Sequence, residues 1–156
     1  MSAATLCAAL LAVTAPDIST QAPTVCPAVV DAAEAYHLRP SLLLSIAWHE
    51  SRLRMDVVHP ESGAAGPLQV MPALQTDAGL VDDGARILRT WLDHEAQQCT
   101  ELPTVADVAQ ALCRYACGYR CSAPCRWSRT RLRLAERIEL ATLASYDDGP
   151  DADEVK

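Results

Sequence analysis

The sequence contains no phenylalanine, and aromatic residues occupy only 4% of its 156 positions. Glycine is also scarce, with six in the whole chain. A β-sandwich needs many strand-forming residues and frequent turns, so this composition argues against one. Half of the residues are apolar, alanine and leucine dominate, and the apolar spacing is mostly helical. We therefore expect an all-α fold with one compact domain and a real core.

Basic residues are in the minority, because 13 Lys and Arg face 20 Asp and Glu for a net charge of -7. The last ten residues, "DDGPDADEVK", are acidic and poor in apolar groups, which predicts disorder. The one Arg-rich stretch, residues 126–137, has helical spacing. We interpret its arginines as a solvated face, with apolar residues packed inward: Leu132, Leu134 and Ile138. Without a basic excess, no nucleic-acid partner is expected.

The apolar N-terminal run "MSAATLCAALLAVTAP" lacks basic residues, since the first in the chain is Arg39. It is too short to span a bilayer and contains small residues before Pro16 that suit cleavage. We interpret residues 1–22 as a secretory signal peptide and linker, residues 23–145 as the folded domain and residues 146–156 as a disordered acidic tail. The protein is then expected in the periplasm or outside the cell.

Seven cysteines are an odd number for an exported chain. Cleavage of the leader would remove Cys7 and leave six, the number that three structural disulfides need: Cys26, Cys99, Cys113, Cys117, Cys121 and Cys125. The sequence does not determine how these six pair. A metal site in the segment 113–125 is the alternative, but the Cys-x-x-Cys pairs of structural zinc sites are missing, so no metal is expected.

The segment "SLLLSIAWHESRLR", residues 41–54, predicts a helix that opens at Pro40 and ends near Arg54. Within it, Glu50 falls on an apolar face, because helical spacing places it beside Leu43, Ile46 and Ala47. That is an unusual place for a carboxyl group, since charged residues are rarely buried without a partner.

Three interpretations of Glu50 are open at this point. The carboxylate could be ion-paired with one of the many arginines, or the helix could end near His49 and leave Glu50 in solvent. Alternatively, a carboxyl group held against apolar walls is more readily protonated, which a general acid working near neutral pH requires. A zinc-protease motif is excluded, because H-E-x-x-H would need histidine where the chain has Leu53.

Apolar periodicity predicts four further helices, over residues 28–37, 82–95, 105–116 and 127–143. Residues 56–67 contain two prolines and two glycines and therefore predict a loop. No internal repeat and no second domain are indicated.

Residues 42–72, "LLLSIAWHESRLRMDVVHPESGAAGPLQVMP", closely resemble the soluble lytic transglycosylases (SLT type) of the goose-type lysozyme superfamily. The family pattern is an apolar helix ending in Glu-Ser, a Gly-Ala-x-Gly-Leu-Met-Gln-x-Met-Pro loop, a helix with Gly-Ala-x-x-Leu, and Ala-Tyr-Asn-x-Gly. The corresponding stretches here, in the same order, are residues 50–51, 63–72, 82–92 and 114–118. The resemblance implies a single lysozyme-like helical domain.

The resemblance also implies roles for the matching residues. Glu50 would be catalytic, and the substrate-binding residues would be Ser62, Gly63, Gly66, Gln69, Met71 and Tyr115. Gln69 would offer its amide to the sugar, Met71 an apolar wall, and Tyr115 a hydroxyl that steadies Glu50, while the two glycines would let the loop approach the glycan. From the residues alone, Gln69 could instead cap a loop, Met71 fill core and Tyr115 be an ordinary core tyrosine.

Two departures from the family pattern stand out. Pro67-Leu68 replaces Leu-Met before Gln69, which keeps apolar bulk. Ala116 stands where the family has asparagine, so a polar group near the cleft is missing.

Glycoside cleavage usually takes two carboxylates, but this sequence offers one on a core-facing helix. A single acid is enough if the substrate's N-acetyl group stabilises the cation and its 6-hydroxyl attacks. The resemblance therefore implies a peptidoglycan lytic transglycosylase that acts on glycan strands without a cofactor. It would cleave the β-1,4 bond between N-acetylmuramic acid and N-acetylglucosamine and leave 1,6-anhydro ends.

Such an enzyme is expected to be a monomer, working alone or within a secretion or phage apparatus. Two alternatives stay open: a hydrolytic muramidase similar to goose-type lysozyme, and a catalytically weak glycan-binding component, which Ala116 motivates.

Overall fold

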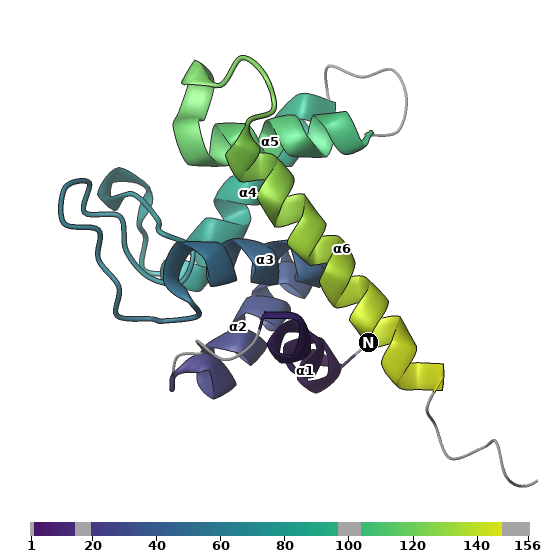
Figure 1. Cartoon of the computed structure of the whole chain (residues 1–156). Coiled ribbons are helices and arrows are strands. Elements are labelled where there is room, and N and C mark those ends of the chain that lie inside the picture. The colour runs from purple at the N-terminus through teal and green to yellow at the C-terminus, as the bar shows by residue number, and fades with distance from the viewer. Residues whose placement is uncertain (1, 15–19, 97–103, 148–156) are drawn as a thin grey trace, which may run out of the picture.

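The computed structural model describes residues 2–14, 20–96 and 104–147, and the predicted all-α fold is confirmed (Figure 1). The described residues form these elements: α1 (Ala3–Thr14), α2 (Ala22–Ala35), α3 (Pro40–Ser51), η1 (Pro72–Leu74), α4 (Leu80–Ala96), α5 (Val105–Cys117), η2 (Gly118–Arg120) and α6 (Arg126–Asp147). No helix among them is both long and apolar enough to cross a membrane. Nearly all of the predicted disordered tail, residues 148–156, lies outside the described residues.

Helix α3 is the central helix of the fold. Its residues 41–48 are all buried, and α2, α6 and α1 pack against it. Ser45 is fully buried in α3, but its hydroxyl is satisfied because it donates to the backbone oxygen of Arg131, 2.6 Å away. Neighbouring helices cover Trp48 as well as Leu43, so α3 is buried all round and not only on the face that its spacing predicted.

Helix α3 ends at Ser51, three residues before the predicted end. Arg52 and Leu53 adopt left-handed backbone conformations, with φ of 57° and 58°. The Arg52 N–H donates to the Trp48 oxygen at 3.0 Å, which closes the helix, and Leu53 is fully buried behind it. This turn sends the chain directly from Glu50 into the loop that faces it.

Helix α6 runs across the fold, with α4 and α5 at one of its ends and α1 and α2 towards the other (Figure 1). Helix α1 packs on α6 and α2, Leu6 and Leu10 are buried, and Cys7 is bonded to Cys26. The cysteine pairing thus differs from the expectation that Cys26 bonds a later cysteine. The reason is that α1 lies beside the start of α2, where the two Cα atoms are 6.0 Å apart. Cleavage of residues 1–22 stays a prediction.

A disulfide in the C-terminal part is confirmed, because Cys113 at the end of α5 is bonded to Cys121. Cys117 and Cys125 carry free thiols, which differs from the expected three disulfides. Cys99 lies outside the described residues. The disulfide uses two of the four sulfur atoms that the metal alternative required.

Candidate active site

The end of α3, the loop after it, α5 and α6 meet around a cavity of about 400 Å³ that Glu50 lines. Its other lining residues are His59, Ser62, Ala64, Leu68, Gln69, Met71, Tyr115, Ala116, Cys117 and Trp127. The structure therefore brings together five of the residues that the sequence predicted for the site: Glu50, Ser62, Gln69, Met71 and Tyr115.

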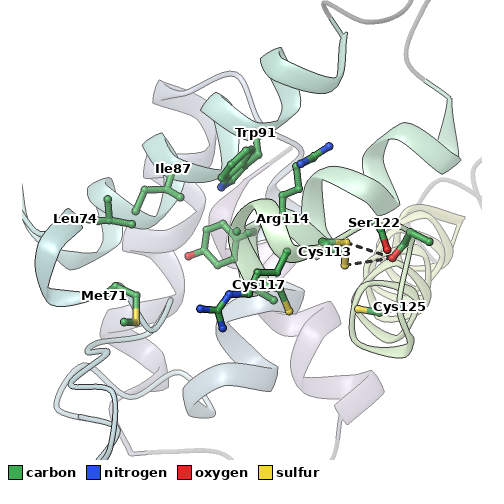
Figure 2. Close-up of a pocket in the computed structure, with 15 residues that line it drawn as sticks. Met71, Leu74, Ile87, Trp91, Cys113, Arg114, Cys117, Ser122 and Cys125 are labelled. Atoms are coloured by element: carbon green, nitrogen blue, oxygen red, sulfur yellow. Dashed lines mark hydrogen bonds between the residues drawn. A yellow bond between two sulfur atoms is a disulfide. The ribbon is translucent and has the colours of Figure 1, made fainter.

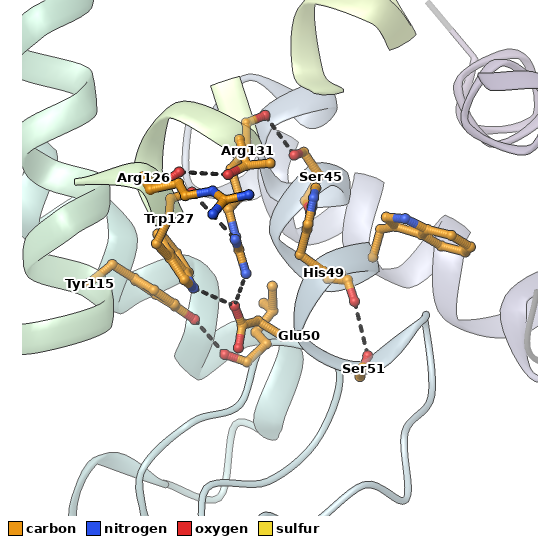
Figure 3. A network of polar contacts seen from close by, with 12 residues as sticks. Ser45, His49, Glu50, Ser51, Tyr115, Arg126, Trp127 and Arg131 are labelled. Carbon is orange, nitrogen blue, oxygen red and sulfur yellow. Dashed lines mark hydrogen bonds and ion pairs between the residues drawn. The ribbon is translucent and has the colours of Figure 1, made fainter. Parts of the chain in front are cut away.

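Glu50 lies in the last turn of α3 with its side chain 20% exposed. Its Oε1 atom accepts hydrogen bonds from Nη2 of Arg131 at 2.8 Å and from Nε1 of Trp127 at 3.0 Å (Figure 3). No described residue donates to Oε2. The interpretation that Glu50 lies in solvent beyond the end of the helix is therefore wrong. The expected ion pair with an arginine is present, and it lies in a cavity of the kind that the catalytic interpretation needs.

Trp127 and Arg131 both come from α6, and sequence reasoning missed them. The other arginines of the stretch are exposed as predicted: Arg126, Arg129, Arg133 and Arg137. Arg131 is instead only 11% exposed, and its guanidinium carbon lies over the Trp127 ring, 4.0 Å from the centroid. Burial lowers the pKa of Arg131 while Glu50 acts in the opposite sense, and an arginine remains cationic in a protein.

Tyr115 lines the cavity from α5, but its hydroxyl has a different partner from the one predicted. It donates to the backbone oxygen of Leu68 at 2.8 Å, and the ring stacks on Trp127 with centroids 6.4 Å apart. Burial, and secondarily the charge of Glu50, raises the pKa of the Tyr115 hydroxyl, so it stays a donor. Trp127 makes the contact with Glu50 that was expected of Tyr115, while Tyr115 fixes the loop.

Gln69 and Met71 line the cavity from the loop. The Gln69 amide nitrogen donates to the backbone oxygen of Gly66 at 3.0 Å, as a loop-capping residue would. No described residue donates to its side-chain oxygen, which can accept from a sugar hydroxyl. Met71 is 46% exposed, so it forms a wall of the cavity and does not fill core.

Residues 27–90 match the family model of the Transglycosylase SLT domain. The predicted resemblance to SLT-type lytic transglycosylases is confirmed. An SLT domain supports a peptidoglycan-degrading function of the lytic transglycosylase kind. The matched residues include Glu50 and the loop but end before Tyr115 and α6. No significant match to a curated protein or to a solved structure was found.

Two glycines of the loop after α3 are not among the residues that line the cavity, and their approach to a glycan stays a prediction. Gly63 and Gly66 have φ of 70° and 74°, a left-handed region that favours glycine. A Cβ atom at Gly63 would lie 3.0 Å from the Pro72 side chain, and one at Gly66 would lie 2.7 Å from that of Leu80. Both glycines therefore let the loop turn and pack on its own surroundings.

A larger cavity of about 780 Å³ adjoins the Glu50 cavity, and the two share Met71, Tyr115, Ala116 and Cys117. Figure 2 shows Ile87 and Trp91 of α4 along one wall of the larger cavity. The shared residues make the two cavities one cleft, which leads from Glu50 towards α4. Ala116, which replaces the asparagine of the SLT pattern, is exposed in the middle of this cleft.

Proposed function

We propose that the protein is a peptidoglycan lytic transglycosylase in which Glu50 is the single general acid and base. The observation that carries the proposal is that Glu50 is the one carboxylate among the described residues that line the cleft. Hydrolysis through two carboxylates needs a second one within about 10 Å across the scissile bond. A single carboxylate with a free oxygen fits a reaction in which the substrate supplies the nucleophile.

The acid step uses the oxygen of Glu50 that the protein leaves free. Oε2 gives its proton to the bridging glycosidic oxygen, and the bond between that oxygen and C1 of the muramoyl sugar breaks. The carbonyl oxygen of the sugar's own N-acetyl group stabilises the cation at C1. Glu50 is left as a carboxylate, beside the Arg131 guanidinium.

The base step restores the acid. The Glu50 carboxylate accepts the proton of the muramoyl 6-hydroxyl while that oxygen bonds to C1. No water is consumed, and the product carries a 1,6-anhydro ring. Gln69 and Met71 line the same cavity and would orient the sugar by a hydrogen bond and by apolar contact.

Product mass tests this proposal directly. Digestion of purified sacculi should release muropeptides that are lighter by one water than those from a hydrolytic muramidase acting on the same sacculi. Mass spectrometry of both digests provides the comparison. If only the hydrated products appear, the muramidase alternative is correct and a positioned water takes the place of the 6-hydroxyl.

A catalytically weak glycan-binding protein is the second candidate, and Ala116 is the observation that favours it. Restoring the family residue with Ala116→Asn should lower KM about two- to tenfold, the effect of one added hydrogen bond. Ala78→Asn is a matched control, because Ala78 is exposed and lines neither cavity. Equal KM values for both variants and the wild type would show that the missing amide does not limit binding.

A further inference from the structure

We propose that Arg131 and Trp127 are positioning residues for Glu50. In this proposal they hold the carboxyl group by Oε1 and present Oε2 to the substrate. The inference rests on the proposed function of Glu50 and deepens it. It also assigns part of the active site to α6, which lies outside the residues matched by the SLT family.

Convergence of two donors on one oxygen is the first argument. The terminal torsion of a glutamate side chain is soft, so the carboxyl group turns freely unless it is held. Here Nη2 of Arg131 and Nε1 of Trp127 both donate to Oε1. An oxygen that already accepts two N–H groups is a poor site for a proton, so the acid proton resides on Oε2, the oxygen left for the substrate.

The second argument is that other contacts hold the two donors, Arg131 and Trp127, in place. Arg131 stacks on Trp127 one helical turn away, and the backbone oxygen of Arg131 accepts a hydrogen bond from buried Ser45 of α3. The α6 backbone is therefore tied to α3 near Glu50.

Other titratable or charged groups face Glu50, but none of them donates to it. These groups are His49 and Arg52 at the end of α3, His59 in the loop, Tyr115 and Cys117 on α5, and Cys125 beside Arg131. Burial lowers the pKa of His49, although its hydrogen bond to Ser45 opposes this, so His49 is neutral near pH 7. Among the described residues, Arg131 and Trp127 are therefore the side chains that hold the Glu50 carboxyl group.

The test compares Arg131→Met, which removes the guanidinium donors, with Arg131→Lys, which keeps an N–H donor. The readouts are kcat and KM on sacculi, with thermal unfolding as the check that each variant folds. In Arg131→Met, kcat should fall by up to about 10²-fold with KM little changed, because Oε2 is no longer held in place. Arg131→Lys should recover part of this loss, and the control Arg129→Met, an exposed arginine on the same helix, should stay close to the wild type.

Trp127→Phe tests the second donor on its own, and it decides the matter if Arg131→Met does not fold. The phenyl ring keeps a surface on which Arg131 can stack, but it cannot donate to Oε1. We expect kcat to fall by up to about 10²-fold through misplacement of Oε2, with KM little changed. A wild-type kcat in Trp127→Phe would overturn the positioning role.

A wild-type kcat in folded Arg131→Met would likewise overturn the positioning role of Arg131. The two proposals can fail separately. If the wild type does not cleave sacculi, the proposed function is wrong. If the wild type cleaves sacculi and both variants keep its kcat, the positioning role alone is overturned.

Discussion

We expect Glu50→Gln to suppress the release of muropeptides from sacculi while the protein keeps its fold. A glutamine has no proton to give to the glycosidic oxygen, so the rate should fall by about 10²- to 10⁴-fold. Its side-chain oxygen can still accept the hydrogen bonds that Trp127 and Arg131 donate to Glu50, which preserves the geometry of the cavity. The measurements are muropeptide release under saturating substrate and thermal unfolding.

The same variant should be slightly less stable than the wild type. For a lone carboxyl group on an apolar face, removal of the charge would be stabilising. The ion pair reverses this expectation, because a glutamine leaves the largely buried Arg131 without a counter-charge. We expect a loss on the order of 1 to 3 kcal/mol, the range for hydrogen bonds to charged groups.

Glu61→Gln is the matched control, since Glu61 is exposed in the loop and does not line the cleft. It should leave both turnover and unfolding temperature unchanged. Full activity in Glu50→Gln would remove the basis of the proposed mechanism. Loss of stability with normal turnover would instead show that the pair between Glu50 and Arg131 is structural.

We expect Gly84→Ala to destabilise the protein and lower its activity, even though alanine is the better helix former. A Cβ atom at Gly84 in α4 would lie 2.4 Å from Cδ1 and 2.6 Å from Cβ of Leu68, which is fully buried. Leu68 cannot simply rotate away, because its own Cβ is one of the atoms in the clash. It would have to shift with its backbone, whose oxygen accepts the Tyr115 hydrogen bond. A shift of the Leu68 backbone would therefore displace the loop and change the shape of the Glu50 cavity.

The cost of overpacking should exceed the gain of about 1 kcal/mol in helix propensity. We expect the free energy of unfolding to fall by about 2 kcal/mol in total. Urea unfolding measures this loss, and kcat/KM on sacculi measures the effect on the cleft. Thr90→Ala, an exposed change on the same helix, should alter neither quantity by much. A Gly84→Ala protein as stable as the wild type would show that the loop can move without cost.

The sequence by itself determined the part of the site that is contiguous in the chain. Apolar periodicity placed Glu50 on a buried helix. The motif spacing in the following loop predicted that Gln69 and Met71 lie in the same site as Glu50. Such features can be predicted because helical geometry and turn residues act over a few positions. Tyr115 could be added because its motif is also a short pattern, although the partner of its hydroxyl could not.

Only the tertiary structure decided which groups touch Glu50 and how the cysteines near the N-terminus pair. Along the chain, Arg131 is one of several arginines that repeat on a polar helix, and nothing local marks it as the one that turns inward with Trp127. Its contact depends on α6 crossing α3, where burial of Ile138 and Leu134 fixes the rotation of α6 about its axis. The pairing of Cys7 with Cys26 likewise depends on α1 packing beside α2. Hydrogen bonds, ion pairs and disulfides between distant segments follow from how whole helices pack, because that packing alone sets which atoms come within reach.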